Sequence, residues 1–314
     1  MSFRGIVVVL FLNVRFFANC SVYDNEINEH SLELTQSLNL ARQELIQEAC
    51  RRFSRNYKLD DLQPDQLRHI LVDDERKLLY CYVPKVACTN WKRLLLILAG
   101  KWNSTDVLSI PGHIPHLPGM FKDLSMVTAQ EREHMLNNYH KMVFVRNPFE
   151  RLLSAYRNKL EGDSPSQYFQ EHVGRRIIKT YRENPSNQSL EFGNDVTFKE
   201  FAMFLTNKSE ELADVVNNEH WQPITDLCHP CQIKYTLVGK YETLLDDVLL
   251  ALHTIQVTGV NFPRLTSTSG TAQKLHKYYS QLDLPLIRRL YKLYKYDFKI
   301  FDYHLDSLVG FDLD

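Results

Sequence analysis

Three segments of the chain repeat one pattern, in which a short apolar run leads through a turn into an amphipathic helix. The expected strands cover residues 77–83, 142–145 and 235–241. Strands that alternate with helices pair in parallel and are covered by helices on both faces. The pattern therefore predicts an α/β fold with three layers around a parallel sheet. A chain of 314 residues, of which 44% are hydrophobic, supplies ample core for it.

The turn after the first strand carries groups that hold anions. In sheets of this kind, ligands bind beyond the carboxyl ends of the strands. Lys85 adds a positive charge there, and Thr89 and Asn90 add hydrogen-bond donors to the free N–H groups of a helix N-terminus. The glycines and the G-K-[S/T] signature of a nucleoside-triphosphate loop are missing, which argues against a kinase. By itself this turn fits an anion site and an ordinary helix cap equally well.

The turn after the second strand has the same character. Arg146 ends the strand and can bind a phosphate with two parallel hydrogen bonds. Asn147 is a good N-cap, Pro148 fits the first helical position, and Glu150 completes a capping-box-like arrangement. The helix places four polar residues on one face, Arg151, Ser154, Arg157 and Asn158. The alternative is a solvated basic face, but two such turns on neighbouring strands indicate a ligand with two separated phosphate-like groups.

The N-terminus and the cysteines indicate a secretory protein. Arg4 precedes an apolar run over residues 6–12, which is too short for a bilayer helix of about 20 residues but fits a secretory signal. A shortened signal anchor and a buried strand are the alternatives. Four sequons support entry into the lumen, at Asn19, Asn103, Asn187 and Asn207. The six cysteines are Cys20, Cys50, Cys81, Cys88, Cys228 and Cys231.

An even number of cysteines permits disulfides, although the sequence does not give their pairing. Cys228 and Cys231 in "CHPC" could begin a zinc site, but no second pair with suitable spacing follows, so a disulfide is favoured and no metal is expected. The formal net charge of −1 provides no global field for nucleic acid, and any polyanion has to be bound by a local basic cleft.

Two motifs make the sequence similar to a known family. "VPKVACTNW" (83–91) and "VFVRNPFERLLSAYRNKL" (143–160) resemble the two cofactor loops of Golgi carbohydrate sulfotransferases, in the branch with the HNK-1 and chondroitin/dermatan 4-O-sulfotransferases. Further matches are "DLQPDQLRHILVDD", "NEHWQPITDLCHPC" and "LVGKYETL", so the resemblance covers about residues 62–303. Within the branch, the sequence looks closest to the chondroitin 4-O-sulfotransferases.

The resemblance implies a P-loop-like fold that uses 3′-phosphoadenylyl sulfate (PAPS) as sulfuryl donor. The first loop would hold the 5′-phosphosulfate and the second the 3′-phosphate. The cofactor-binding residues are then Pro84, Lys85, Val86, Ala87, Cys88, Thr89, Asn90, Arg146, Asn147, Pro148, Phe149, Glu150, Arg151, Leu152, Leu153 and Ser154. Lys85 would stabilise charge on the bridging oxygen as the sulfuryl group leaves.

An acceptor hydroxyl that attacks sulfur needs a base. The family suggests a histidine or a carboxylate, and the sequence leaves His220, with Glu219 beside it, and His113, in "GHIPHLPG", as alternatives. Sulfuryl transfer in this family is a direct displacement, so Cys88 is interpreted as structural. Two basic clusters are available for a glycosaminoglycan acceptor, Arg175, Arg176 and Lys179, and Arg288, Arg289, Lys292 and Lys295.

The expected organisation is a signal peptide or short signal anchor over 1–20, a stem or peripheral helix over 21–61, and a catalytic domain over 62–314. The expected product is chondroitin or dermatan sulfated at the 4-position of N-acetylgalactosamine, made in the Golgi lumen. The alternatives are another acceptor, such as terminal N-acetylgalactosamine or glucuronate, and a lumenal glycan-binding protein without activity. Membrane attachment would rest on the weak N-terminal anchor.

Overall fold

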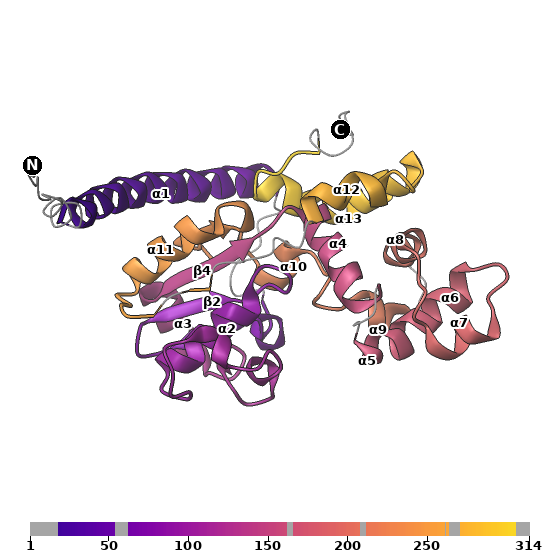
Figure 1. Ribbon diagram of the computed structural model, residues 1–314, viewed down its shortest axis with the longest axis horizontal. Coiled ribbons are helices and arrows are strands. Elements are labelled where there is room, and N and C mark those ends of the chain that lie inside the picture. Colours follow the sequence, from indigo (N-terminus) through magenta and orange to yellow (C-terminus); the bar gives the residue numbers. More distant parts are fainter. Residues whose placement is uncertain are drawn as a thin grey trace, which may run out of the picture.

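The computed structural model describes residues 18–53, 62–161, 166–207, 212–260, 262–263 and 271–305. Its centre is a five-stranded sheet with the order β3-β1-β2-β4-β5 (Figure 1). The strands are β1 (Ile70–Asp73), β2 (Leu78–Cys81), β3 (Lys122–Asp123), β4 (His140–Val145) and β5 (Leu237–Lys240). The expected signal segment lies outside the described residues, apart from the start of the first helix.

The three predicted strands are β2, β4 and β5, and they pair in parallel as expected. The sheet as a whole is nevertheless mixed, because β1 pairs antiparallel with both β2 and β3. A short turn joins β1 to β2, and a connection of that length can only reverse the chain. The prediction of an α/β fold is therefore confirmed, and the prediction of a purely parallel sheet is wrong at this edge.

Helices cover both faces of the sheet, which gives the expected layers (Figure 1). One face carries α2 (Cys88–Leu98), which follows β2, with α3 (Ala129–Asn138) close by. The other face carries α11 (Leu244–Thr254), which follows β5. Trp91 of α2 is fully buried and packs against Phe144 of β4 with 5.1 Å between ring centroids. This contact holds α2, and with it the turn that precedes the helix, against the sheet.

The segment expected to be a stem or peripheral helix forms α1 (Ala18–Phe53), and its second half packs on the body of the protein. The Asn39 side chain forms two hydrogen bonds with the backbone at β5, as the backbone of a neighbouring strand would. Its amide donates to the Thr236 carbonyl at 3.0 Å, and its oxygen accepts from the Val238 N–H at 2.8 Å. Arg42 adds an ion pair with Asp247 at 2.6 Å. The helix thus covers the edge strand, which would otherwise expose unsatisfied backbone groups.

A second, helical lobe follows β4 and lies to the right in Figure 1. It comprises α4 (Pro148–Lys159), α5 (Gln167–Phe169), η5 (Gln170–Gly174), α6 (Arg175–Tyr181), α7 (Asn187–Phe192), α8 (Phe198–Thr206) and α9 (Ala213–Val216). The C-terminal helices α12 (Thr271–Tyr279) and α13 (Leu284–Ile300) pack against it. Its core is aromatic, with Trp221 and Phe201 buried at a centroid distance of 5.5 Å.

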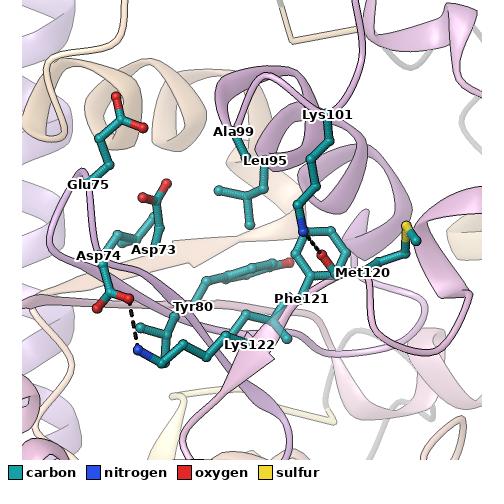
Figure 2. A pocket seen from close by; sticks show the side chains of 13 residues that line it. Asp73, Asp74, Glu75, Tyr80, Leu95, Ala99, Lys101, Met120, Phe121 and Lys122 are labelled. Carbon is teal, nitrogen blue, oxygen red and sulfur yellow. Dashed lines mark hydrogen bonds and ion pairs between the residues drawn. The ribbon is translucent and has the colours of Figure 1, made fainter.

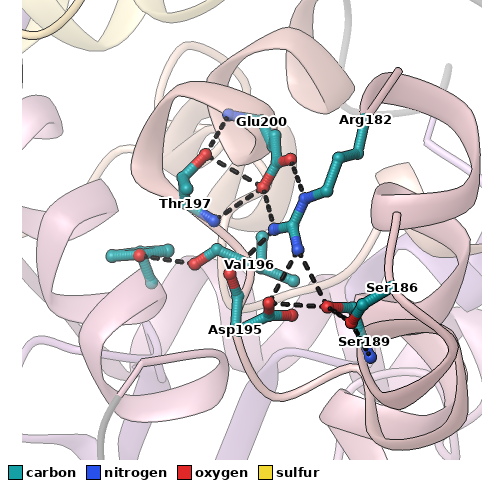
Figure 3. A network of polar contacts seen from close by, with 8 residues as sticks. Arg182, Ser186, Ser189, Asp195, Val196, Thr197 and Glu200 are labelled. Carbon is teal, nitrogen blue, oxygen red and sulfur yellow. Dashed lines mark hydrogen bonds and ion pairs between the residues drawn. The ribbon is translucent and has the colours of Figure 1, made fainter. Parts of the chain in front are cut away.

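An arginine network holds α6 to the start of α8 (Figure 3). Arg182 pairs with Glu200 at 2.7 Å and with Asp195 at 2.7 Å. Glu200 also closes a capping box with Thr197. Because both carboxylates accept from one guanidinium, the loop before α8 is fixed to the end of α6.

Two disulfides connect distant parts of the chain. Cys81 at the end of β2 is bonded to Cys228 at the end of α10 (Ile224–Cys228), and Cys50 of α1 is bonded to Cys231. The two cysteines of "CHPC" therefore have different partners and form no zinc site with each other. Both bonds anchor residues 224–231, which follow the His220 segment directly.

The remaining short helices are η2 (Pro64–Leu67), η3 (Val107–Ser109), η4 (Ile114–His116) and η7 (Tyr241–Thr243). Among the helices of the described ranges, none is long and apolar enough to cross a membrane.

Candidate functional site

The first turn lies between β2 and α2 and bends sharply without a glycine. Lys85 and Ala87 both have positive φ angles, of 72° and 57°. Non-glycine residues adopt this region at an energetic cost, and such strain is concentrated at functional sites. The bend leaves Ala87 as the N-cap of α2, without a side-chain cap. The first N–H groups of the helix are therefore available to an anion.

Lys85 is enclosed among other cations. Burial, together with the nearby charges of Lys159, Arg146 and Arg151, lowers its pKa to about 8. No carboxylate within the described ranges forms an ion pair with Lys85. A desolvated ammonium group in this position gains a counter-charge when an anionic ligand binds.

The second turn is built as predicted, with one exception. The Asn147 side chain caps α4 by accepting from the N–H groups of Phe149 and Glu150 at 3.0 and 3.3 Å. Glu150 does not complete a capping box. Its carboxylate accepts from Arg146 at 3.2 Å instead, and the Asn147 N–H donates to Glu242 at 3.0 Å. The stronger attraction of a guanidinium for a carboxylate explains the difference.

Arg146 joins the two turns. Its Nη1 donates to the Lys85 carbonyl at 3.3 Å, and its guanidinium lies 4.0 Å from the centre of the Tyr241 ring. The side chain is only 3% exposed. The predicted proximity of the two anion-ready turns is thus confirmed. The Nε and Nη2 atoms of Arg146, however, already donate to the Glu150 carboxylate.

Arg151 lies in the interior and not on a solvated basic face. It is 1% exposed, and it donates to three backbone carbonyls, of Pro84 at 3.0 Å, Glu219 at 2.9 Å and Gln222 at 2.6 Å. One guanidinium on α4 therefore connects the first turn to the segment that carries His220. Its role is to position these two segments.

Other predicted cofactor residues divide by burial. The side chains of Val86, Phe149, Leu152 and Leu153 are in the core, so only their backbone groups could face a ligand. Burial raises the pKa of the free thiol of Cys88, which keeps it protonated. Among the other predicted residues, Pro84 and Pro148 are buried and Ser154 is half-buried. The Asn90 side chain accepts a hydrogen bond from Arg93.

His220 is held in one tautomer beside the cation cluster. Its Nδ1–H donates to the Asn218 side chain at 2.8 Å, which leaves Nε2 as the proton acceptor. Burial lowers its pKa to about 2, and the charges of Lys159, Lys85 and Arg151 contribute. The imidazole is therefore neutral at physiological pH. Glu219, the neighbouring carboxylate, turns away and accepts from the Tyr82 hydroxyl at 3.1 Å.

The structure brings His116 to the first turn, and not His113. Both histidines are exposed, but the Nε2 atom of His116 lies 3.0 Å from the Thr89 hydroxyl. Burial lowers the pKa of His116 to about 4, helped by the charge of Lys92. Both histidines are in the quoted loop "GHIPHLPG", and the sequence offered no periodicity with which to choose between them.

Two lysines that the sequence reasoning left out complete the walls of the site. Lys92 of α2 is 6% exposed, and its ammonium group lies 3.5 Å from the centre of the Tyr82 ring. Lys159 ends α4, with its ammonium group 4.6 Å from the centre of the Phe169 ring. Lys159 belongs to the matched motif "YRNKL", but it falls outside the polar face that was singled out.

Two pockets lie outside this cluster. One, of about 270 Å³, lies at the opposite end of β2 beside the β1–β2 turn, where Asp74 pairs with Lys122 at 2.8 Å (Figure 2). The other, of about 240 Å³, is lined by Val145 and Lys240 at the carboxyl ends of β4 and β5, with Arg42 of α1. Within the described ranges, no group of three or more His, Cys, Asp or Glu residues is arranged to hold a metal ion.

The fold is α/β, and two anion-ready turns meet at the carboxyl ends of its neighbouring parallel strands. Residues 68–304 match the sulfotransferase family. The chain is 38% identical over 290 residues to carbohydrate sulfotransferase 11 of Rattus norvegicus. The aligned residues cover 91% of this chain and 82% of the relative. The chain is 40% identical over 273 residues to carbohydrate sulfotransferase 11 of Danio rerio, covering 86% and 77%.

Carbohydrate sulfotransferase 14 of Danio rerio is 37% identical over 273 residues, covering 85% of this chain and 71% of the relative. No solved structure matches the chain. The chain belongs to the sulfotransferase family and is an enzyme of that class.

Proposed function

We propose that the protein transfers a sulfuryl group from PAPS to a glycan hydroxyl, the 4-position of N-acetylgalactosamine in chondroitin or dermatan. The observation that carries the proposal is the contact between the two turns, in which Arg146 donates to the Lys85 carbonyl at 3.3 Å. PAPS has two anionic ends, and the joined turns offer Lys85 with the uncapped N-terminus of α2 at one position and Arg146 with the Ser154 hydroxyl at the other. The names of the relatives support a carbohydrate acceptor.

In the proposed reaction, Lys85 and the first N–H groups of α2 bind the 5′-phosphosulfate. The acceptor oxygen attacks sulfur, and the bond between sulfur and the bridging oxygen breaks. The electron pair stays on the 5′-phosphate, where the Lys85 ammonium group stabilises the new charge. The second turn binds the 3′-phosphate through Arg146 and the Ser154 hydroxyl, with Arg146 exchanging part of its contact with Glu150.

We assign the role of base to His220, because its tautomer is fixed by Asn218 and its Nε2 atom can take the acceptor's proton once the anionic donor offsets the charges of Lys159 and Lys85, which lower its pKa. His116 orients the Thr89 hydroxyl toward the phosphosulfate. Arg151 is a positioning residue, since it connects the Pro84 and Glu219 carbonyls and so sets the distance between the donor turn and His220.

The proposed location is the Golgi lumen, with the chain either anchored at its N-terminus or released after signal cleavage. The two disulfides support an oxidising compartment, since such bonds are rare in the cytosol. Asn103, Asn187 and Asn207 are exposed and can accept glycans, whereas the Asn19 side chain lies outside the described residues. The boundary between stem and catalytic domain near residue 62 stays a prediction.

The acceptor is tested with radiolabelled PAPS and a panel of desulfated chondroitin, dermatan, heparosan and short N-acetylgalactosamine glycans. Products are digested to disaccharides. Label at the 4-position of N-acetylgalactosamine from chondroitin or dermatan is the expected result. Label on another glycan would retain the donor and refute the acceptor, and no transfer to any glycan would refute the proposed function.

A further inference from the structure

The charge of Lys159 acts on several other titratable groups of the site. Its charge lowers the pKa of Lys85, of His116 and of His220. Its own ammonium group lies over Phe169, whose ring packs edge-on against His220 at a centroid distance of 5.2 Å. Lys159 is therefore close to the base on one side and to the donor lysine on the other.

The ammonium group has no carboxylate partner within ion-pair distance among the described residues. Burial lowers its pKa, and Glu219 is the carboxylate whose charge acts in the opposite direction. Glu219 is itself engaged, since it accepts from Tyr82 at 3.1 Å and lies 3.7 Å from His69. Lys159 and Lys85 thus approach each other as two partly desolvated cations, an arrangement that a bound anion would relieve.

The helix that carries Lys159 separates it from the 3′-phosphate end of the site. Lys159 ends α4, five residues after Ser154, and at 1.5 Å per residue it lies about 7.5 Å further along the helix axis. The 5′-phosphate is served from the other wall, by Lys85 and the N-terminus of α2. The anion that lies between Lys85 and His220 in the proposed reaction is the sulfuryl group in transfer.

We propose that Lys159 is a second catalytic lysine, whose ammonium group binds the non-bridging oxygens of the sulfuryl group and holds it in line between donor and acceptor. This rests on the proposed function. The acceptor oxygen forms its bond to sulfur as the bridging S–O bond breaks, the acceptor's proton passes to His220, and the leaving electron pair stays on the 5′-phosphate beside Lys85. Lys159 neither gains nor loses a proton in the step.

The test compares Lys159→Met, Lys159→Arg and the exposed control Lys199→Met with the wild type. Methionine keeps an apolar stem over Phe169 and removes the charge. The readouts are the single-turnover rate of sulfuryl transfer to chondroitin and the Kd of 3′-phosphoadenosine 5′-phosphate, the product that lacks the sulfuryl group. For Lys159→Met we expect a rate loss of about 10² to 10³, the effect of removing one charge-stabilising donor.

The expected Kd of the product changes by less than about threefold in Lys159→Met, because no sulfuryl group is present to lose its contact. Lys159→Arg should be at least about tenfold faster than Lys159→Met, and Lys199→Met should behave as wild type. A rate within about threefold of wild type in Lys159→Met would overturn the proposal, as would product binding that weakens in step with the rate or is lost.

Failure of this inference is distinguishable from failure of the proposed function. A wild-type protein that transfers sulfuryl groups together with an unimpaired Lys159→Met variant contradicts only the role of Lys159. A wild-type protein that transfers to no glycan contradicts the proposed function itself.

Discussion

Replacing Arg151 by methionine should destabilise the whole protein and not merely weaken a ligand contact. The guanidinium is 1% exposed and donates to the Pro84, Glu219 and Gln222 carbonyls. Each buried carbonyl that loses its partner costs about 1–3 kcal/mol. The three carbonyls share one cation, so their costs are not additive, and methionine restores part of the packing. We expect the free energy of unfolding to fall by about 3–5 kcal/mol.

The assay is chemical denaturation of the purified protein with its disulfides intact, followed by tryptophan fluorescence, since Trp221 directly precedes Gln222. Arg157→Met is the matched control on the same helix. Arg157 is partly exposed and pairs with Glu161 at 3.5 Å, so the change should cost no more than about 1 kcal/mol. A decrease of less than about 1 kcal/mol in the free energy of unfolding of Arg151→Met would refute the reasoning, because three carbonyls that lose a charged donor should cost more than that.

Two further predictions concern the disulfides and a buried histidine. Replacing Cys81 and Cys228 together by serine should lower the free energy of unfolding by about 2–5 kcal/mol, and an unchanged melting temperature would argue against the bond. The pKa of the buried His69 is lowered to about 4, below the unfolded value of about 6.5. The folded state then binds fewer protons than the unfolded chain, so stability is full above pH 6.5 and falls as the pH drops toward 4. Melting curves between pH 7.5 and 4.5 check this, and a melting temperature that rises on acidification would contradict it.

The strand–turn–helix units could be predicted because their signals are local. Each signal lies within a short stretch of the sequence: the apolar runs, the Asn147–Pro148 cap and the spacing of three or four residues within each helix. The order of the parallel strands and the meeting of the two turns follow from the same units. The antiparallel edge was missed, since β1 and β3 are short and carry no alternation strong enough to identify them.

The site itself was predictable only in part, because its assembly depends on contacts between distant residues. Arg151 and Arg157 look alike in sequence, yet only Arg151 is enclosed by carbonyls from residues 84 and 219–222. The choice of His116 over His113 depends on how the loop folds back on Thr89, and no spacing encodes it. Partners for Cys228 and Cys231 likewise lie far away in the chain, at Cys81 and Cys50.

Both turns together form one site, and binding of 3′-phosphoadenosine 5′-phosphate tests this most directly. Calorimetry on the purified protein should show saturable binding of one nucleotide per chain. Lys85→Ala and Arg146→Ala should each weaken that binding while leaving the protein folded, because each removes a cation from a different end of the same ligand. Absence of binding to the folded wild type, or full affinity in both variants, would contradict the account.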